Sequence, residues 1–102
     1  MSYRYRITIE KLGPLQSHRQ EEESLQFCAD NHDPLLEIVK AIRAKRLLDM
    51  DRSASLAIGL KLLGEIVLEK RKDPLFAPLV LPIRNFTQQL KSLEPVSNTT
   101  KP

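Results

Sequence analysis

The fold is decided at residues 3–12, which are YRYRITIEKL and alternate between apolar and polar side chains. In an extended chain, successive side chains point to opposite faces. One face then carries Tyr3, Tyr5, Ile7 and Ile9, and the other carries Arg4, Arg6, Thr8 and Glu10. This period of two predicts a β-strand with one buried face and one solvated face.

A second strand is expected at residues 24–30, after Gly13-Pro14 ends the first strand and a polar loop runs to Glu23. The positions expected to face inward are Leu25, Phe27 and Ala29, and those expected to face outward are Ser24, Gln26 and Cys28. Two such strands joined by a loop are predicted to pair as a long antiparallel hairpin.

A helix is expected to begin at Asp33-Pro34, because Asp33 can cap exposed backbone N–H groups and Pro34 suits the first helical position. An i, i+3, i+4, i+7 stripe follows and consists of Leu35, Ile38, Val39 and Ile42. This spacing predicts an amphipathic helix that lies on a core and ends near residues 46–48.

Two further helices are predicted. The longer one begins at Asp51 or Ser53, runs to about residue 72, and carries an apolar arc wide enough to be covered from more than one side. Pro78 and Pro82 then predict a short connector, because proline disrupts a helix interior. The last helix is expected at residues 83–93.

The expected architecture is α+β in the order ββααα, an antiparallel hairpin with amphipathic helices packed on one face. Residues 1–94 are predicted to form a single domain, and residues 95–102 a flexible polar tail. A two-stranded sheet is marginally stable alone and its edges can pair with another chain. Either the helices shield the hairpin, or strands of two copies join in a homodimer.

Composition excludes several classes of protein. The 102 residues suffice for one domain, and 41% hydrophobic with 28% charged residues is typical of a folded chain. The net charge of +3 is interrupted by residues 13–33, which hold one basic and five acidic residues. No single-sign charged field of the kind that binds nucleic acid is therefore expected.

Cys28 is the only cysteine, so no internal disulfide can form and a reducing compartment is expected. The first strand begins at Tyr3 without an apolar leader, and the uncharged stretch 76–83 is too short to span a bilayer. The sequence therefore predicts a cytoplasmic protein without a membrane segment.

Candidate catalytic and metal-binding residues are few. Cys28, His32 and Asp33 are close in sequence and could form a thiol nucleophile with a base and an orienting acid. A small strand residue followed by a capping turn explains them more simply. His18 and His32 with one cysteine match no known metal-ligand spacing, so neither a metal nor a cofactor is expected.

Residues 58–76, IGLKLLGEIVLEKRKDPLF, resemble a family of small bacterial proteins known as a domain of unknown function. The same resemblance includes residues 3–10, YRYRITIE, the LQF of residues 25–27 and the NHD of residues 31–33. It extends to about Leu93 and implies a compact bacterial cytoplasmic protein. It implies no activity, cofactor or catalytic residue.

The absence of a catalytic constellation favours a non-enzymatic protein-interaction or regulatory module, acting as a homodimer or with another protein. The predicted contact surface is the outer hairpin face, formed by Arg4, Arg6, Thr8, Gln26 and Cys28. One alternative is a small enzyme or ligand-binding protein that uses Cys28 and His32. The other is a weak nucleic-acid binder through Arg4 and Arg6, although Tyr3 and Tyr5 are expected on the opposite face, where they could not stack bases beside these cations.

Overall fold

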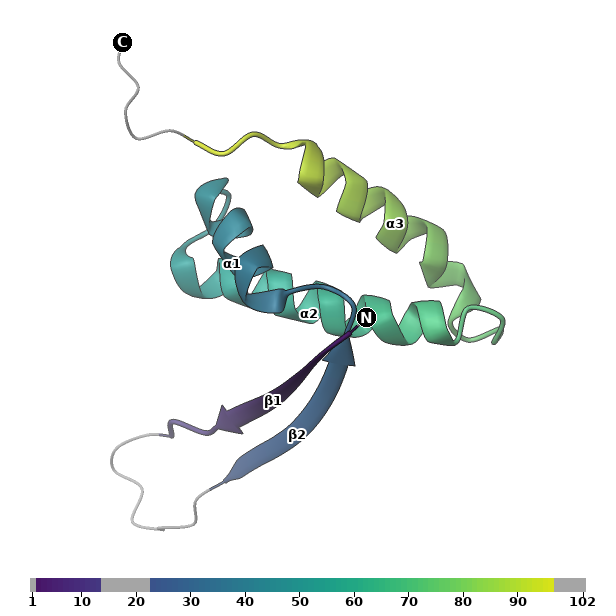
Figure 1. Cartoon of the computed structure of the whole chain (residues 1–102), viewed down its shortest axis with the longest axis horizontal. Helices are drawn as coiled ribbons and strands as arrows, with labels where there is room; N and C mark the ends of the chain where they lie inside the picture. Colours follow the sequence, from purple (N-terminus) through teal and green to yellow (C-terminus); the bar gives the residue numbers. More distant parts are fainter. Residues whose placement is uncertain (1, 14–22, 97–102) are drawn as a thin grey trace. The chain divides into compact units, whose positions relative to one another are not determined.

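The computed structural model describes residues 2–13 and 23–96 and confirms the order ββααα (Figure 1). The elements are β1 (Tyr3–Glu10), β2 (Ser24–Asn31), α1 (Leu35–Ala44), α2 (Met50–Glu69) and α3 (Ala77–Ser92). Two compact units divide the chain, Met1–His32 with the strands and Asp33–Pro102 with the helices. The single domain over residues 1–94, and the placement of helices on one face of the hairpin, stay predictions.

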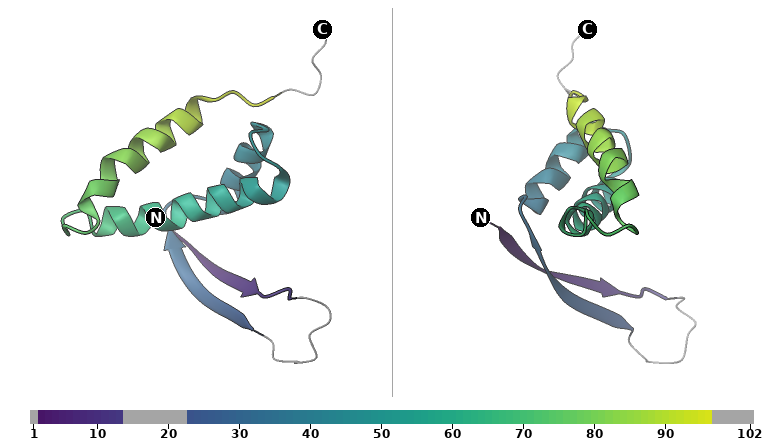
Figure 2. Two further views of the ribbon diagram at one scale, coloured as in Figure 1. Left: turned by 180° about the vertical axis from the view of Figure 1, so that it is seen from behind. Right: turned by 90° about the vertical axis from the view of Figure 1, so that its right-hand side faces the viewer.

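The hairpin unit is an antiparallel pair in which Tyr3 lies opposite Asn31 and Glu10 lies opposite Ser24. The ladder continues one step beyond the strands, because the backbone N–H of Lys11 donates to the carbonyl of Glu23 at 3.0 Å. The strands twist around each other in Figure 2, as expected for L-residues. Most of the predicted polar loop, residues 14–22 with His18, lies outside the described residues.

The start of α1 differs from the prediction, because Pro34 and not Asp33 occupies the N-cap. The carbonyl of Pro34 accepts from the N–H groups of Glu37 and Ile38 at 3.1 Å, and the proline side chain itself makes no capping bond. Pro34 is extended, as expected of an N-cap residue. Asp33 Oδ2 instead lies 2.9 Å from Lys61 Nζ on α2.

The start of α2 differs from the prediction as well, since the helix begins at Met50 and not at Asp51 or Ser53. Asp49 is the N-cap, and its Oδ1 accepts from the backbone N–H of Arg52 at 2.7 Å. The turn before it contains Arg46 in the left-handed region with φ of 56°, which ends α1 and redirects the chain.

The predicted proline connector is wrong, since α3 begins at Ala77 and contains both prolines. Pro78 lies in the first turn, where backbone N–H groups have no partner within the helix, so its missing N–H costs little. Pro82 lies inside the helix and removes a single hydrogen bond, which the remaining turns of this 16-residue helix tolerate.

The three helices form one small core. In Figures 1 and 2, α1 lies along the first half of α2, and α3 returns from the far end of α2. The core cluster consists of Val39, Ile42, Ala57 and Leu90. The backbone N–H of Val96 donates to the carbonyl of Ala44 at 2.8 Å and ties the end of α3 back to α1. Residues 97–102 of the predicted tail lie outside the described residues.

Candidate functional site

The outer face of the hairpin brings together the polar residues singled out from the sequence. Register places Arg6 opposite Cys28 and Thr8 opposite Gln26, so their side chains share one face. Arg4 lies opposite Asp30, with Nη1 3.9 Å from Oδ1. All of these residues are exposed, so the ion pair is weak and leaves the face accessible.

The other face of the hairpin is apolar, and sequence reasoning expected it to be buried. The structure instead leaves large apolar side chains half exposed: Tyr3 46%, Ile9 54%, Leu25 56% and Phe27 37%. The rings of Tyr3 and Tyr5 lie on this face with centroids 6.3 Å apart. A two-stranded sheet has no second layer of its own, so its two strands cannot cover this face themselves.

The backbone edges of the hairpin follow from its hydrogen-bond pattern. Lys11 and Glu23 form a hydrogen-bonded pair, and such pairs recur at every second residue of an antiparallel ladder. The odd-numbered residues of β1 therefore bond to β2, and the even-numbered residues direct their N–H and C=O groups away from it. The outward groups of β1 belong to Arg4, Arg6, Thr8 and Glu10, and those of β2 to Ser24, Gln26, Cys28 and Asp30.

Cys28 and His32 are not brought together. Cys28 is an exposed free thiol within β2, and His32 follows the end of that strand. Four residues of extended chain separate them by about 13 Å, too far for proton transfer between the side chains. Within residues 2–13 and 23–96, no three His, Cys, Asp or Glu side chains are close enough together to hold a metal ion.

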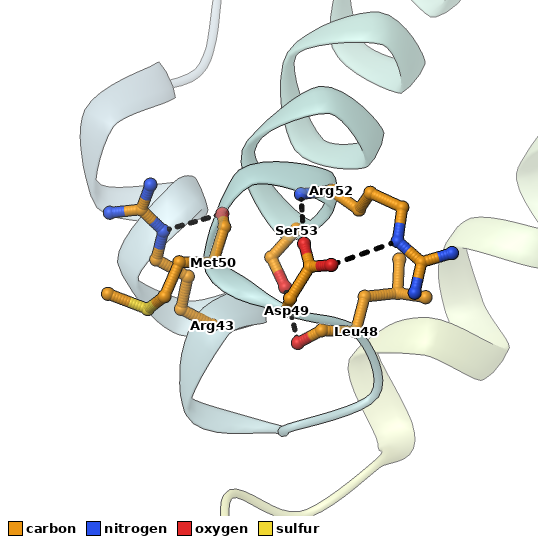
Figure 3. Close-up of polar contacts among 6 residues, drawn as sticks. All are labelled: Arg43, Leu48, Asp49, Met50, Arg52 and Ser53. Carbon is orange, nitrogen blue, oxygen red and sulfur yellow. Dashed lines mark hydrogen bonds and ion pairs between the residues drawn. The ribbon is translucent and has the colours of Figure 1, made fainter.

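Figure 3 shows a group of polar contacts at the start of α2. Asp49 Oδ2 accepts from Arg52 Nε at 3.2 Å, Ser53 Oγ donates to the carbonyl of Leu48 at 3.3 Å, and Arg43 Nε donates to the carbonyl of Met50 at 3.0 Å. The backbone N–H of Arg52 lowers the pKa of Asp49 below its usual value, with a smaller contribution from the Arg52 guanidinium. These contacts fix a helix start and the turn before it.

Basic side chains in the helical unit also serve local structure. Lys45 Nζ donates to the carbonyl of Leu93 at 2.6 Å, and Arg71 Nη1 donates to the carbonyl of Leu68 at 2.9 Å. The carbonyls of Leu68 and Leu93 lie at helix C-termini, where carbonyls lack partners within the helix, while the bond from Arg43 links the end of α1 to the start of α2. Three of the basic residues at the ends of α1 and α2, Arg43, Lys45 and Arg71, thus have structural partners.

A hollow of about 250 Å³ lies between the three helices. Its lining includes the core residues Ile42, Ala57 and Leu90, and contains no cysteine or histidine. Lysines and one glutamate stand among the other lining residues, namely Lys45, Lys61, Lys91 and Glu37. The hollow is therefore a mainly apolar gap beside the core with charged side chains in its lining, and no thiol or imidazole lines it.

The DUF3861 family model, described as a domain of unknown function, matches residues 3–92. The chain belongs to the DUF3861 family. This confirms the resemblance found in residues 3–10 and 58–76, and the match ends one residue before Leu93. No helix within residues 2–13 and 23–96 is long and apolar enough to cross a membrane.

A solved structure supports the same assignment. The crystal structure of a protein of unknown function, eca1910, from Pectobacterium atrosepticum is similar to this chain, with a TM-score of 0.74 and 31% sequence identity. The match covers 89% of this chain and 98% of the bacterial protein. No curated protein matches the chain. The DUF3861 fold is thus shared with a bacterial protein, and neither match specifies a reaction.

Proposed function

We propose that this DUF3861 chain is a non-enzymatic protein-interaction module of the bacterial cytoplasm, and that it acts as a homodimer joined through its β hairpin. The observation that carries the proposal is the half-exposed apolar face of Tyr3, Ile9, Leu25 and Phe27 on a sheet of only two strands. A sheet of two strands also has backbone groups on its outer edges that do not pair within the hairpin, and such edges are typical sites of pairing with another chain.

A second copy meets the physical needs of the hairpin. An isolated two-stranded sheet is marginal in water, and it becomes stable either with further strands that share an apolar face or by packing against a helix. Two hairpins joined edge to edge form a four-stranded sheet and enlarge the apolar face into one continuous surface. A closed pair also removes one exposed edge from each copy, which lowers the risk of further aggregation.

The alternative functions have weaker support. Catalysis by Cys28 and His32 would need a chain movement of about 10 Å to bring the thiol and imidazole into hydrogen-bond range. Nucleic-acid binding would need cations beside stacking rings, whereas Arg4 and Arg6 lie on the face opposite the paired Tyr3 and Tyr5 rings.

The test is sedimentation equilibrium of the full chain over a range of concentrations. We expect wild type to reach twice the mass of one chain, and Ile9→Asp to remain monomeric because aspartate is unfavourable in a strand and replaces an apolar cross-strand contact between the two copies. Leu36→Asp is the matched control, since Leu36 is 70% exposed on α1 in the helical unit. A wild-type chain that sediments as a monomer at every concentration would contradict the proposal.

A further inference from the structure

The geometry points to one specific dimer: two copies pair antiparallel along β1, about a two-fold axis at Ile7. This inference rests on the proposed homodimer and names the strand, the register and the residues that join the copies. It follows from the edge groups of β1 and from the order of charges along that strand.

Hydrogen bonding restricts the register. The outward backbone groups of β1 are those of the even-numbered residues, so a second β1 must offer even-numbered residues opposite them. An axis at Ile7 satisfies this rule by placing Arg6 opposite Thr8 of the second copy, and Arg4 opposite Glu10 of the second copy. All four outward residues of each strand then have a partner.

Charge selects this register over its neighbours. With the axis at Ile7, Arg4 faces Glu10 of the second copy, and the two-fold repeats this ion pair on the other side. An axis at Arg6 would place two Arg6 guanidinium groups directly opposite, which is destabilising. An axis at Thr8 would leave Arg4 without an opposing strand residue, because β1 ends at Glu10.

The edge of β2 is less suited to pairing with itself. Its outward residues are Ser24, Gln26, Cys28 and Asp30, and Asp30 is the charged residue among these four. If two β2 strands paired, none of these four residues would place a basic side chain opposite Asp30 of the second copy. Pairing of β1 with β2 of another copy would leave one edge open at each end and continue into a chain of molecules. Only the β1 pair is both closed and complementary in charge.

The same register joins the apolar faces. Ile7 meets Ile7 of the second copy on the axis, and Tyr5 lies opposite Ile9 of the second copy on either side. Aromatic and β-branched residues form favourable cross-strand pairs. The four-stranded sheet, in the order β2-β1-β1-β2, then carries one apolar face that includes Leu25 and Phe27 from both copies.

Disulfide crosslinking of the full chain tests the register, with Cys28→Ser as the background in a glutathione redox buffer. Ile7→Cys places two thiols in a non-hydrogen-bonded pair with Cα atoms about 4.5 Å apart, within the range for a disulfide. We expect a crosslinked species of twice the chain mass on a non-reducing gel. Ile9→Cys is the matched control on the same face, because its two copies would lie about 13 Å apart and the crosslink is lost.

Charge reversal provides an independent measurement. Arg4→Glu and Glu10→Arg are each expected to weaken dimerisation about tenfold, because each replaces both ion pairs by like charges. The double variant Arg4→Glu/Glu10→Arg restores opposite charges and is expected to restore dimerisation. The carboxylate introduced at position 4 faces Asp30 in both the Arg4→Glu single variant and the double variant, so damage to the hairpin itself would not be rescued.

The outcomes separate the inference from the proposed function. A wild-type dimer in which Thr8→Cys crosslinks and Ile7→Cys does not would overturn the Ile7 axis and leave the homodimer in place. A wild-type monomer would overturn both.

Discussion

The helical unit and the hairpin unit differ in how far they bury their apolar side chains. The helices bury Val39, Ile42, Ala57 and Leu90 against one another, and the interior contains a satisfied hydroxyl at Ser53. The hairpin buries none of its large apolar side chains, and four of them are between 37% and 56% exposed. The helical unit therefore has a core of its own, while the hairpin unit has an apolar face without buried side chains of this kind.

This difference indicates where structure and interaction reside in the chain. The cap of α2, buried aliphatic residues and hydrogen bonds at helix ends hold the helical unit together. A protein that left an apolar face and two strand edges exposed without use would incur a risk of aggregation. This contrast is the reason for proposing the hairpin, and not the helices, as the interaction site.

The largest expected effect is on the helical core. Leu90→Ala removes a side chain that is 7% exposed, and we expect the free energy of unfolding of the helices to fall by about 2–5 kcal/mol. Leu25→Ala, at a position 56% exposed on the hairpin, is the matched control and should change it by less than about 1 kcal/mol. Urea titration followed by circular dichroism at the helix band measures both values. Equal losses from the two variants would contradict the contrast between the units.

A smaller effect is expected at the cap of α2. Asp49→Ala removes the acceptor for the Arg52 N–H and should lower the midpoint of thermal unfolding, whereas Asp49→Asn keeps an oxygen acceptor and should lower it less. Because the folded state lowers the pKa of Asp49, the cap stabilises fully above the ordinary carboxyl pKa of about 4 and this stabilisation is lost as pH falls through the lower folded value. The difference in the midpoint of thermal unfolding between wild type and Asp49→Asn should therefore narrow below about pH 4. A difference in midpoint that widens on acidification would contradict the capping role of Asp49.

Local patterns predicted the element order because each element has a strong periodicity. The alternation of residues 3–10 indicates a strand, and the stripe from Leu35 to Ile42 indicates a helix. Helix starts were harder to predict, because Asp33, Asp49 and Asp51 are all acceptable caps by residue type. The backbone geometry makes Asp49 the N-cap of α2 and Pro34 the N-cap of α1.

The prolines of α3 and the exposure of the hairpin face could not be predicted for a related reason. Pro78 is compatible with either a connector or a first helical turn, and the choice depends on whether later residues continue the helix. The alternation of β1 shows which side chains share a face, but whether that face is covered depends on contacts distant in sequence or in another molecule. The polar face of Arg4, Arg6, Thr8, Gln26 and Cys28 could be assembled from the sequence, while its role as a contact surface stays a prediction.

The measurement that tests the central claim most directly is amide hydrogen exchange of the full chain, followed by NMR at low and high protein concentration. If β1 joins two copies, the outward N–H groups of Arg6 and Thr8 become slow to exchange at high concentration, because each bonds to the second strand. The outward N–H groups of Gln26 and Cys28 on β2 should stay fast at both concentrations. Equal and rapid exchange on both edges at every concentration would contradict a dimer formed through β1.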